Sequence, residues 1–194
     1  MGLRIIGGKQ RGRKLLTVKG LDTRPTANRM RESLFNILSA RVIGSHVLDL
    51  FAGTGALGME ALSRGAVSAV FIDQAREALS VMGRNIEIGG WGEQARIIKW
   101  NIVTNLKCLK GWMPPFDMVF MDPPYHTGCV QKALKNLCDS DCLSAAATIV
   151  VEHSLEEQVP ETLLGLEVVD QRIYSRTVFS FLHLTSTAEK ETLV

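Results

Sequence analysis

The stretch "VLDLFAGTGALG" (Val47 to Gly58) decides the fold, because an apolar run ends there in glycines that lead into a helical pattern. The glycines have the spacing G-x-G-x-x-G, which nucleotide-binding folds place between a strand and a helix. Asp49 lies four residues before Gly53, where its carboxylate would repel a pyrophosphate but accept a hydrogen bond from a cationic amine. Asp73 follows Gly53 by twenty residues, the usual distance for an acid that binds ribose hydroxyls. This pattern favours a nucleoside with an amine and no pyrophosphate, and S-adenosylmethionine fits that description.

Strand-like and helix-like segments alternate from residue 46 onward. Strands are expected at 46–52, 68–73, 95–99, 116–121 and 146–153, and helices at 56–65, 74–90 and 127–139. Such alternation predicts an α/β fold, Rossmann-like, with a mostly parallel sheet and helices on both faces. The segment 165–185 instead has the pattern of two strands joined by a short turn. We expect it to form an antiparallel C-terminal hairpin at the edge of a seven-stranded sheet.

The two ends of the chain differ from this alternating region. Residues 3–18 predict a glycine-interrupted β-hairpin, and residues 23–40 contain a helix with apolar side chains at helical spacing. We therefore divide the chain into a basic hairpin-and-helix extension (1–40), a nucleoside-binding domain (41–185) and a polar tail (186–194) that is expected to be disordered.

A second motif, "MDPPYHTG" (Met121 to Gly128), follows the fourth predicted strand. Prolines end a strand because they lack an N–H, so Asp122 is expected at the strand's carboxyl end and Pro123-Pro124 in a stiff turn. Ligands of this fold bind beyond the carboxyl ends of the strands. The motif therefore presents an acid and the ring of Tyr125 to the bound nucleoside.

This arrangement suits methyl transfer to the exocyclic amine of a nucleobase. Such an amine is a poor nucleophile because its lone pair is delocalised into the ring. The Asp122 carboxylate and a backbone carbonyl fixed by the prolines can accept its two N–H groups and hold the nitrogen in place. Tyr125 offers a face on which an extruded base can stack. We expect His126 to be a rim residue. Glu152, at the end of the fifth strand, could reach the site, but solvation at the sheet edge is the favoured interpretation.

Charge is distributed unevenly along the chain. Residues 1–31 hold nine basic side chains and one acid, a net +8, whereas the remaining 163 residues hold 13 basic and 19 acidic side chains, a net −6. A basic extension on an acidic body indicates a phosphate-rich partner, although a solvated surface would give the same composition. The expected phosphate contacts, which would be RNA contacts if the partner is RNA, are Arg4, Lys9, Arg11, Arg13, Lys14, Arg24, Arg29 and Arg31.

Composition excludes several other classes. The chain of 194 residues is 46% hydrophobic and 22% charged, which is typical of a globular protein, and it has no apolar stretch long enough to span a membrane. The N-terminus lacks the apolar segment of a signal peptide. The four cysteines form no CxxC pair, so reduced thiols, a cytoplasmic location and no metal site are expected.

The motifs together resemble a known family. "DLFAGTGALG" and "DPPY", about seventy residues apart, are similar to the motifs of Rossmann-like class I amino-methyltransferases that use S-adenosylmethionine. "RIIGGKQRGRKL" and "RPTANRMRESLFNIL" resemble the front segment of the bacterial enzymes that methylate N2 of a guanine in 16S ribosomal RNA. The resemblance spans about residues 3 to 184.

The resemblance implies roles for particular residues. It implies that Asp122, Pro123, Pro124 and Tyr125 hold the target base. It implies a cofactor site at the first strand end, the glycine loop and the ends of the next two strands: Asp49, Phe51, Ala52, Gly53, Thr54, Gly55, Asp73, Gln74 and Asn101. Asn101 stands where the family usually has an acid, so it would accept the adenine amine without charge assistance.

Two other functions stay open at this stage. Adenine-N6 methylation of DNA or RNA uses the same Asp-Pro-Pro-Tyr chemistry, because both amines offer two N–H donors. A catalytically silent RNA-binding assembly factor would share the basic extension. The expected partner is 16S ribosomal RNA, free or within the small ribosomal subunit, bound by a monomer.

Overall fold

The computed structural model describes residues 2–18, 25–125, 127–157, 159–160 and 162–185. The helices are α1 (Pro25–Leu38), α2 (Ala56–Ser63), α3 (Arg76–Gly89) and α4 (Cys129–Cys138), with short 3-10 helices η1 (Ser39–Val42) and η2 (Lys107–Leu109). The strands are β1 (His46–Leu50), β2 (Ser68–Asp73), β3 (Ala95–Lys99), β4 (Phe116–Met121), β5 (Leu143–Ser154), β6 (Thr162–Leu163), β7 (Leu166–Tyr174) and β8 (Thr177–Leu184). The expected tail 186–194 lies outside the described residues.

One sheet organises the fold, with the strand order β3-β2-β1-β4-β5-β8-β7-β6. The first five strands in this order are parallel, and β8, β7 and β6 add antiparallel pairs at one edge. The Rossmann-like α/β fold and the C-terminal hairpin are therefore confirmed. The expected number of seven strands is wrong, because the two-residue strand β6 pairs with the start of β7 and makes eight.

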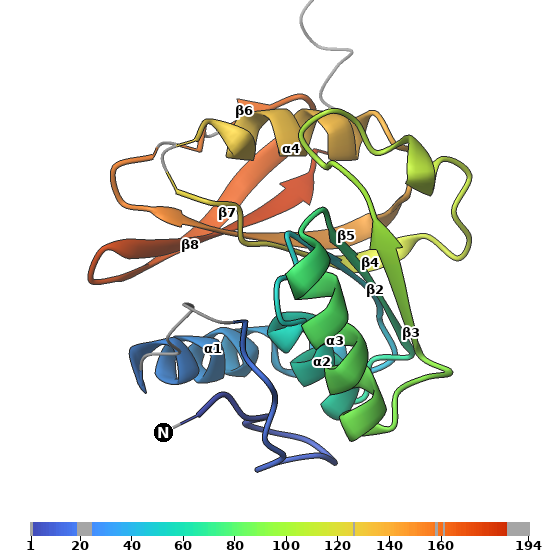
Figure 1. Ribbon diagram of the computed structural model, residues 1–194. Coiled ribbons are helices and arrows are strands. Elements are labelled where there is room, and N and C mark those ends of the chain that lie inside the picture. Colours follow the sequence, from blue (N-terminus) through green and yellow to red (C-terminus); the bar gives the residue numbers. More distant parts are fainter. Residues whose placement is uncertain (1, 19–24, 126, 158, 161, 186–194) are drawn as a thin grey trace, which may run out of the picture.

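Helices cover both faces of the parallel part of the sheet (Figure 1). Side chains of α1, α2 and α3 pack against one set of strand residues, including Val47 and Phe120. Side chains of α4 and of the loop before β4 pack against the alternate residues, including Leu48 and Met121. The strands therefore read as continuous apolar runs, because successive side chains enter two different buried layers.

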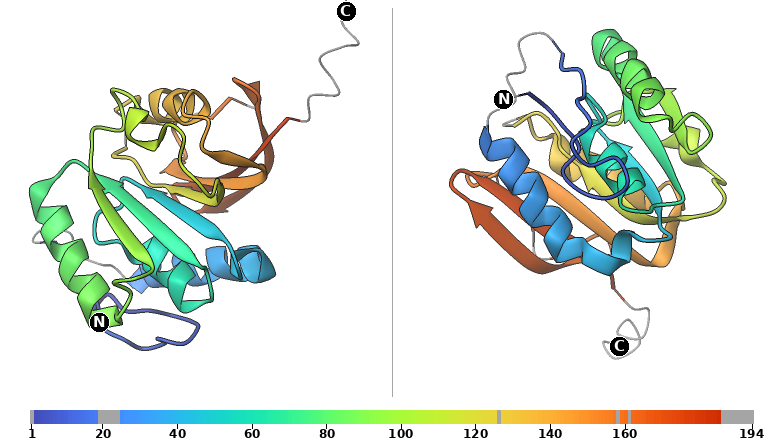
Figure 2. Two further views of the ribbon diagram at one scale, coloured as in Figure 1. Left: turned by 90° about the vertical axis from the view of Figure 1, so that its right-hand side faces the viewer. Right: turned by 90° about the horizontal axis from the view of Figure 1, so that it is seen from below.

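The N-terminal extension packs onto the face that carries α1 and α2 (Figure 2). Leu3, Ile5 and Leu15 are buried in the same apolar cluster as Phe35 of α1. The predicted hairpin forms only one β-bridge, between Arg4 and Lys14, because the glycine-rich segment between them turns without forming strands.

Polar contacts with α2 hold the extension in place. The buried carboxylate of Glu60 accepts hydrogen bonds from the Ile6 N–H and the Gly7 N–H, both at 2.7 Å. The same carboxylate pairs with Arg64 at 2.8 Å and lies 3.9 Å from the buried guanidinium of Arg31. Since its apolar side chains belong to the core, the extension is a structural part of the domain, and its boundary at residue 40 stays a prediction.

Candidate active site

Four carboxylates lie on one face of the sheet near the carboxyl ends of neighbouring strands. Asp73 ends β2, Asp49 lies in β1, Asp122 follows β4, and Glu152 lies near the end of β5. The residues two positions before these acids are buried in the same apolar cluster as side chains of α1, α2 and α3; they are Phe71, Val47, Phe120 and Val150. Because side chains alternate along a strand, all four acids lie on the face of the sheet that these helices cover. The fold thus brings together acids from four separate segments, and we call this group the carboxylate row.

The glycine loop bends sharply between β1 and α2. Phe51 has a φ of 57°, which is strained for a bulky side chain, and Gly53 and Gly55 have φ of 55° and 79°. A Cβ at Gly58 would lie 2.4 Å from the ring of Phe71, so α2 can approach β2 only with glycine there. Asp73 stabilises the bend, because its carboxylate accepts the Gly53 N–H at 2.9 Å and the Ala75 N–H at 2.8 Å.

Asp49 lies deeper than the other members of the carboxylate row. Its side chain is 2% exposed and accepts the Gly58 N–H at 2.9 Å. Burial raises the pKa of Asp49 to about 8, the Gly58 hydrogen bond opposes that shift, and the charge of Asp73 adds to it. The structure thus gives Asp49 a contact with the first turn of α2, and a contact with the cofactor amine stays a prediction.

Asp122 and Glu152 lie side by side, because Met121 and Val151 are partners in the β4–β5 register. Asp122 is exposed, but the protein around it removes part of its hydration. That desolvation, followed by the charges of Glu152 and Asp49, raises its pKa well above the usual value. Glu152 is only partly exposed and its carboxylate accepts the Tyr125 O–H at 3.0 Å. Of the two interpretations of Glu152, the favoured one, solvation at the sheet edge, is therefore wrong.

The turn after Asp122 is fixed by further contacts. Pro123 is buried, and the Pro124 carbonyl accepts the Thr127 hydroxyl at 2.6 Å. The hydroxyl of Tyr125 also lies 3.3 Å from that of Thr177 in β8, while 39% of the Tyr125 residue remains exposed. The structure therefore anchors Tyr125 at its hydroxyl end and leaves part of its ring accessible. His126 lies outside the described residues.

The predicted residues at the ends of β2 and β3 are exposed. Gln74 follows Asp73, and Asn101 follows β3 after Trp100. The Asn101 side-chain oxygen accepts the N–H groups of Val103 and Thr104 at 3.1 and 3.2 Å. This oxygen already accepts two N–H groups of a local turn, so an adenine amine that bound to it would compete with them.

Sequence reasoning missed Asn85 of α3, which connects the extension to the glycine loop. Its fully buried amide accepts the Leu16 N–H at 2.7 Å and donates to the carbonyls of Leu16 and Thr54 at 3.1 and 3.0 Å. The one available signal is a polar residue beside the apolar positions Met82 and Ile86 of this helix. Asn85 therefore ties the extension to the predicted cofactor loop.

The predicted RNA-binding residues separate into two groups. A groove of about 400 Å³ between the extension and α1 is lined by Arg4, Ile5, Ile6, Arg11, Gly12, Asn28, Arg29 and Glu32. Lys9 and Lys14 are exposed on the same extension. Arg31 is 6% exposed and donates to the Arg4 carbonyl at 2.6 Å, so it acts inside the protein. Arg13 donates to the Ile88 carbonyl at 2.6 Å but remains exposed, and Arg24 lies outside the described residues.

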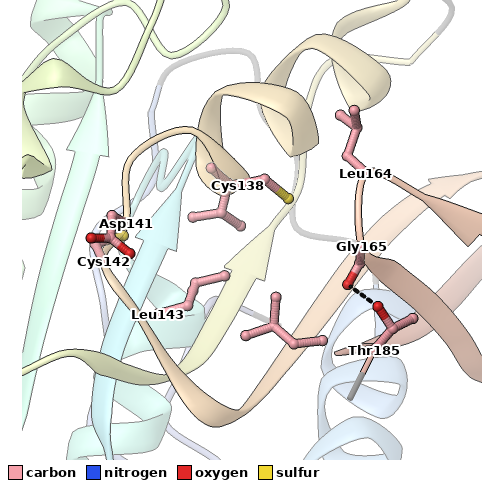
Figure 3. A pocket seen from close by; sticks show the side chains of 9 residues that line it. Cys138, Asp141, Cys142, Leu143, Leu164, Gly165 and Thr185 are labelled. Atoms are coloured by element: carbon pink, nitrogen blue, oxygen red, sulfur yellow. Dashed lines mark hydrogen bonds between the residues drawn. The ribbon is translucent and has the colours of Figure 1, made fainter. Parts of the chain in front are cut away.

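Another pocket, of about 200 Å³, lies away from these residues (Figure 3). It is lined by Cys138, Cys142 and Leu143, near the start of β5, together with Gly165 and Thr185. All four cysteines are free thiols, and among the described residues no group of three His, Cys, Asp or Glu side chains could hold a metal ion. Within the described chain, no helix is long and apolar enough to cross a membrane.

Known proteins are similar to this chain over most of its length. A family model described as Conserved hypothetical protein 95 matches residues 3–183. Ribosomal RNA small subunit methyltransferase D of Escherichia coli (strain K12) is 39% identical over 158 residues, which cover 81% of this chain and 78% of the relative. The Haemophilus influenzae protein of the same name is 38% identical over 180 residues, covering 89% and 93%.

Solved structures show the same fold. The structure of Escherichia coli yhhF has 32% identity and a TM-score of 0.81, covering 95% of this chain and 98% of that one. The ribosomal protein L11 methylase of Lactobacillus delbrueckii subsp. bulgaricus, at 16% identity and a TM-score of 0.68, covers 87% and 83% and shares the fold alone. The chain therefore belongs to the Conserved hypothetical protein 95 family and is a class I methyltransferase of the ribosomal RNA small subunit methyltransferase D type.

Proposed function

We propose that this protein methylates the exocyclic N2 amine of a guanine in 16S ribosomal RNA, with S-adenosylmethionine as the methyl donor. The observation that carries the proposal is the position of Asp122, in the carboxylate row and at the start of the Pro-Pro-Tyr turn. The ribosomal RNA small subunit methyltransferases among its relatives support the substrate class. We expect the protein to act as a monomer in the cytoplasm, on free RNA or on the small subunit.

The carboxylate row fits S-adenosylmethionine chemically. Acids gathered on one face favour a ligand that brings positive charge and N–H or O–H donors. Desolvation is the main cause of the raised pKa values of Asp49 and Asp122, and the charges of neighbouring carboxylates add to both shifts. The cofactor would supply an electrophilic methyl group. Asp73 would accept the ribose hydroxyls, and the glycine loop, shaped by Asp49, would enclose the rest.

The target amine would lie against Asp122. The carboxylate and the Pro123 carbonyl can accept its two N–H groups, which holds the nitrogen in place and favours its pyramidal, reactive form. Tyr125 would stack on the extruded base, with its orientation fixed by Glu152 and Thr177. Since the amine loses its proton only as the bond to carbon forms, the site needs no strong base.

The basic groove beside the extension would bind the RNA backbone. Its guanidinium groups come from Arg4, Arg11 and Arg29, and the exposed amines of Lys9 and Lys14 extend the positive surface. Three arginines around one groove suit phosphate oxygens, which they can contact bidentately.

Methyl transfer from labelled S-adenosylmethionine to unmethylated 16S RNA and to small subunits, followed by nucleoside mass spectrometry, tests the proposal. We expect N2-methylguanosine. N6-methyladenine as the product would show that the target base is adenine and not guanine. Absence of any product, with no cofactor binding by calorimetry, would favour the silent assembly factor.

Substitution of Asp73 should weaken cofactor binding. Asp73→Ala removes the expected ribose acceptor and also the acceptor for the Gly53 and Ala75 N–H groups. Hydrogen bonds to a charged group contribute about 1.5–3 kcal/mol, so we expect a dissociation constant about 10- to 100-fold higher by calorimetry. Asp117→Ala is the matched control, because its carboxylate accepts the His46 N–H at the opposite end of the sheet. Equal affinities for the Asp73 variant and the wild type would contradict the ribose assignment.

Removal of charge from the basic groove should weaken RNA binding without affecting the cofactor. Point substitutions are needed, because deletion of the extension would expose Leu3, Ile5 and Leu15 of the core. For Arg11→Gln/Arg29→Gln we expect the slope of log affinity against log salt to flatten by up to ~0.7 for each lost contact with single-stranded RNA. The control, Lys107→Gln/Lys110→Gln, removes the same charge from exposed positions near η2. Identical slopes in the two double variants would show that the groove does not bind phosphate.

A further inference from the structure

Glu152 lies beside Asp122 and also contacts Tyr125. The β4–β5 register sets Asp122 and Glu152 on adjacent strands, and both point to the same face of the sheet. The charge of Glu152 also contributes, after desolvation, to the raised pKa of Asp122, in agreement with this placement. An amine held by Asp122 would therefore bring the neighbouring ring atom of its base towards Glu152.

The contact with Tyr125 orients the Glu152 carboxylate. Oε1 of Glu152 accepts the Tyr125 O–H at 3.0 Å, and the Thr177 hydroxyl lies 3.3 Å from the same phenol oxygen. This contact uses one carboxylate oxygen, so the carboxylate can accept a second donor. Because Glu152 is only partly exposed, a base that leaves this acceptor unpaired carries a larger cost than it would in water.

Guanine and adenine differ at the atom beside the reacting amine. In guanine the N2 amine is next to N1–H, a hydrogen-bond donor, whereas in adenine the N6 amine is next to N1, an acceptor. Two adjacent carboxylates can accept the N2–H and the N1–H of guanine together. With adenine, the carboxylate of Glu152 would face the lone pair of N1. Both of these groups are acceptors, so neither would have a hydrogen-bond donor.

We propose that Glu152 is a specificity-determining residue that accepts N1–H of the target guanine and thereby excludes adenine. This inference rests on the proposed function and supplies the feature that distinguishes the two amines, which Asp122 and Pro123 treat alike. Such specificity comes chiefly from the cost of binding the wrong base, because a site built around a hydrogen bond strongly disfavours an analogue that lacks the donor.

A base analogue combined with a Glu152 variant tests the N1 contact. 2-Aminopurine keeps the reacting 2-amino group, but its N1 carries no hydrogen and it lacks the O6 carbonyl, so only the part of the preference that depends on Glu152 reports on N1. We expect wild-type protein to use RNA with guanine at the target position at least about tenfold better, in kcat/KM, than the same RNA with 2-aminopurine there. In Glu152→Gln, whose amide can donate to an unprotonated N1, guanine should lose at least about tenfold and the preference should fall towards unity or reverse.

Tyr125→Phe separates base reading from support of the ring. It removes the hydroxyl that contacts Glu152 while leaving the carboxylate, so both RNAs should lose activity by the same factor and the preference should persist. The cofactor dissociation constant of each variant checks that its site is folded. Equal use of the two RNAs by the wild type, or an unchanged preference in Glu152→Gln, would overturn the proposal. Methylation of the guanine RNA by the wild type would still support the proposed function in either of those cases.

Discussion

Asp122→Ala is expected to lower kcat for methyl transfer by about 10²- to 10³-fold while changing the cofactor dissociation constant little. Loss of one preorganised acceptor or donor at a reacting group typically has this effect, equivalent to about 3–4 kcal/mol. The site is formed without Asp122, because the glycine loop is held by Asp73 and Asp49 through their own backbone contacts. Single-turnover rates with saturating RNA, together with calorimetry, would measure the two effects separately.

Two comparisons make this prediction specific. Asp139→Ala removes an exposed carboxylate that pairs with Lys135 on α4, so it should leave the rate unchanged. Asp122→Asn keeps one acceptor oxygen but adds a donor, so it should lose most of the activity too. Wild-type turnover in either Asp122 variant would show that the amine is held elsewhere.

The pH dependence of kcat should also reflect the role proposed for Asp122. If Asp122 holds the amine as proposed, transfer requires its ionised form, and desolvation together with the charges of Glu152 and Asp49 raises its pKa. A group with a raised pKa becomes protonated at a higher pH than an ordinary aspartate, so kcat should fall at that higher pH as the solution is acidified.

Much of the parallel sheet was predictable from the sequence, because its strands are buried on both faces. The boundaries 68–73, 95–99 and 116–121 agree with β2, β3 and β4, where apolar runs end at charged or turn residues. The two-residue strand β6 was not predictable, since Thr162–Leu163 carries no periodic pattern and pairs only because β7 returns beside it. The N-terminal hairpin was predicted as strands, but its glycines allow a compact turn with one bridge.

The candidate site was predictable only where a motif is local. The glycine loop and the Asp-Pro-Pro-Tyr turn are continuous in sequence, so their residue types are enough to predict roles for them. Glu152 and Asn85 act on partners 27 and 31 residues away, Tyr125 and Thr54, and their roles depend on strand register and helix packing. Arg31 shows the converse, because charge counts cannot distinguish a buried guanidinium paired with Glu60 from one that faces RNA.

The second large effect is expected from Glu60→Ala, which should lower the free energy of unfolding by about 3–5 kcal/mol. Removal of one partner from a buried ion pair leaves the other charge uncompensated, and here that charge is Arg31. The substitution also leaves the N–H groups of Ile6 and Gly7 without their acceptor. For a chain of this size the melting temperature should fall by about 2–4 °C per kcal/mol, and thermal and urea unfolding would measure both quantities.

A double substitution distinguishes the buried charge from the lost backbone contacts. Arg31→Met in the Glu60→Ala background removes the uncompensated guanidinium, so it should restore part of the stability, as a double-mutant cycle would quantify. The Ile6 and Gly7 amides should still exchange hydrogen faster than in the wild type, because their acceptor remains absent. Glu32→Ala, at an exposed position of α1, is the control and should change stability by no more than about 0.5 kcal/mol. If Glu60→Ala were as stable as that control, Glu60 would not be what holds the basic extension on α2. The groove would then have to be maintained by the apolar contacts of Leu3, Ile5 and Leu15 and by the hydrogen bonds of Ser63 and Asn85 with the extension.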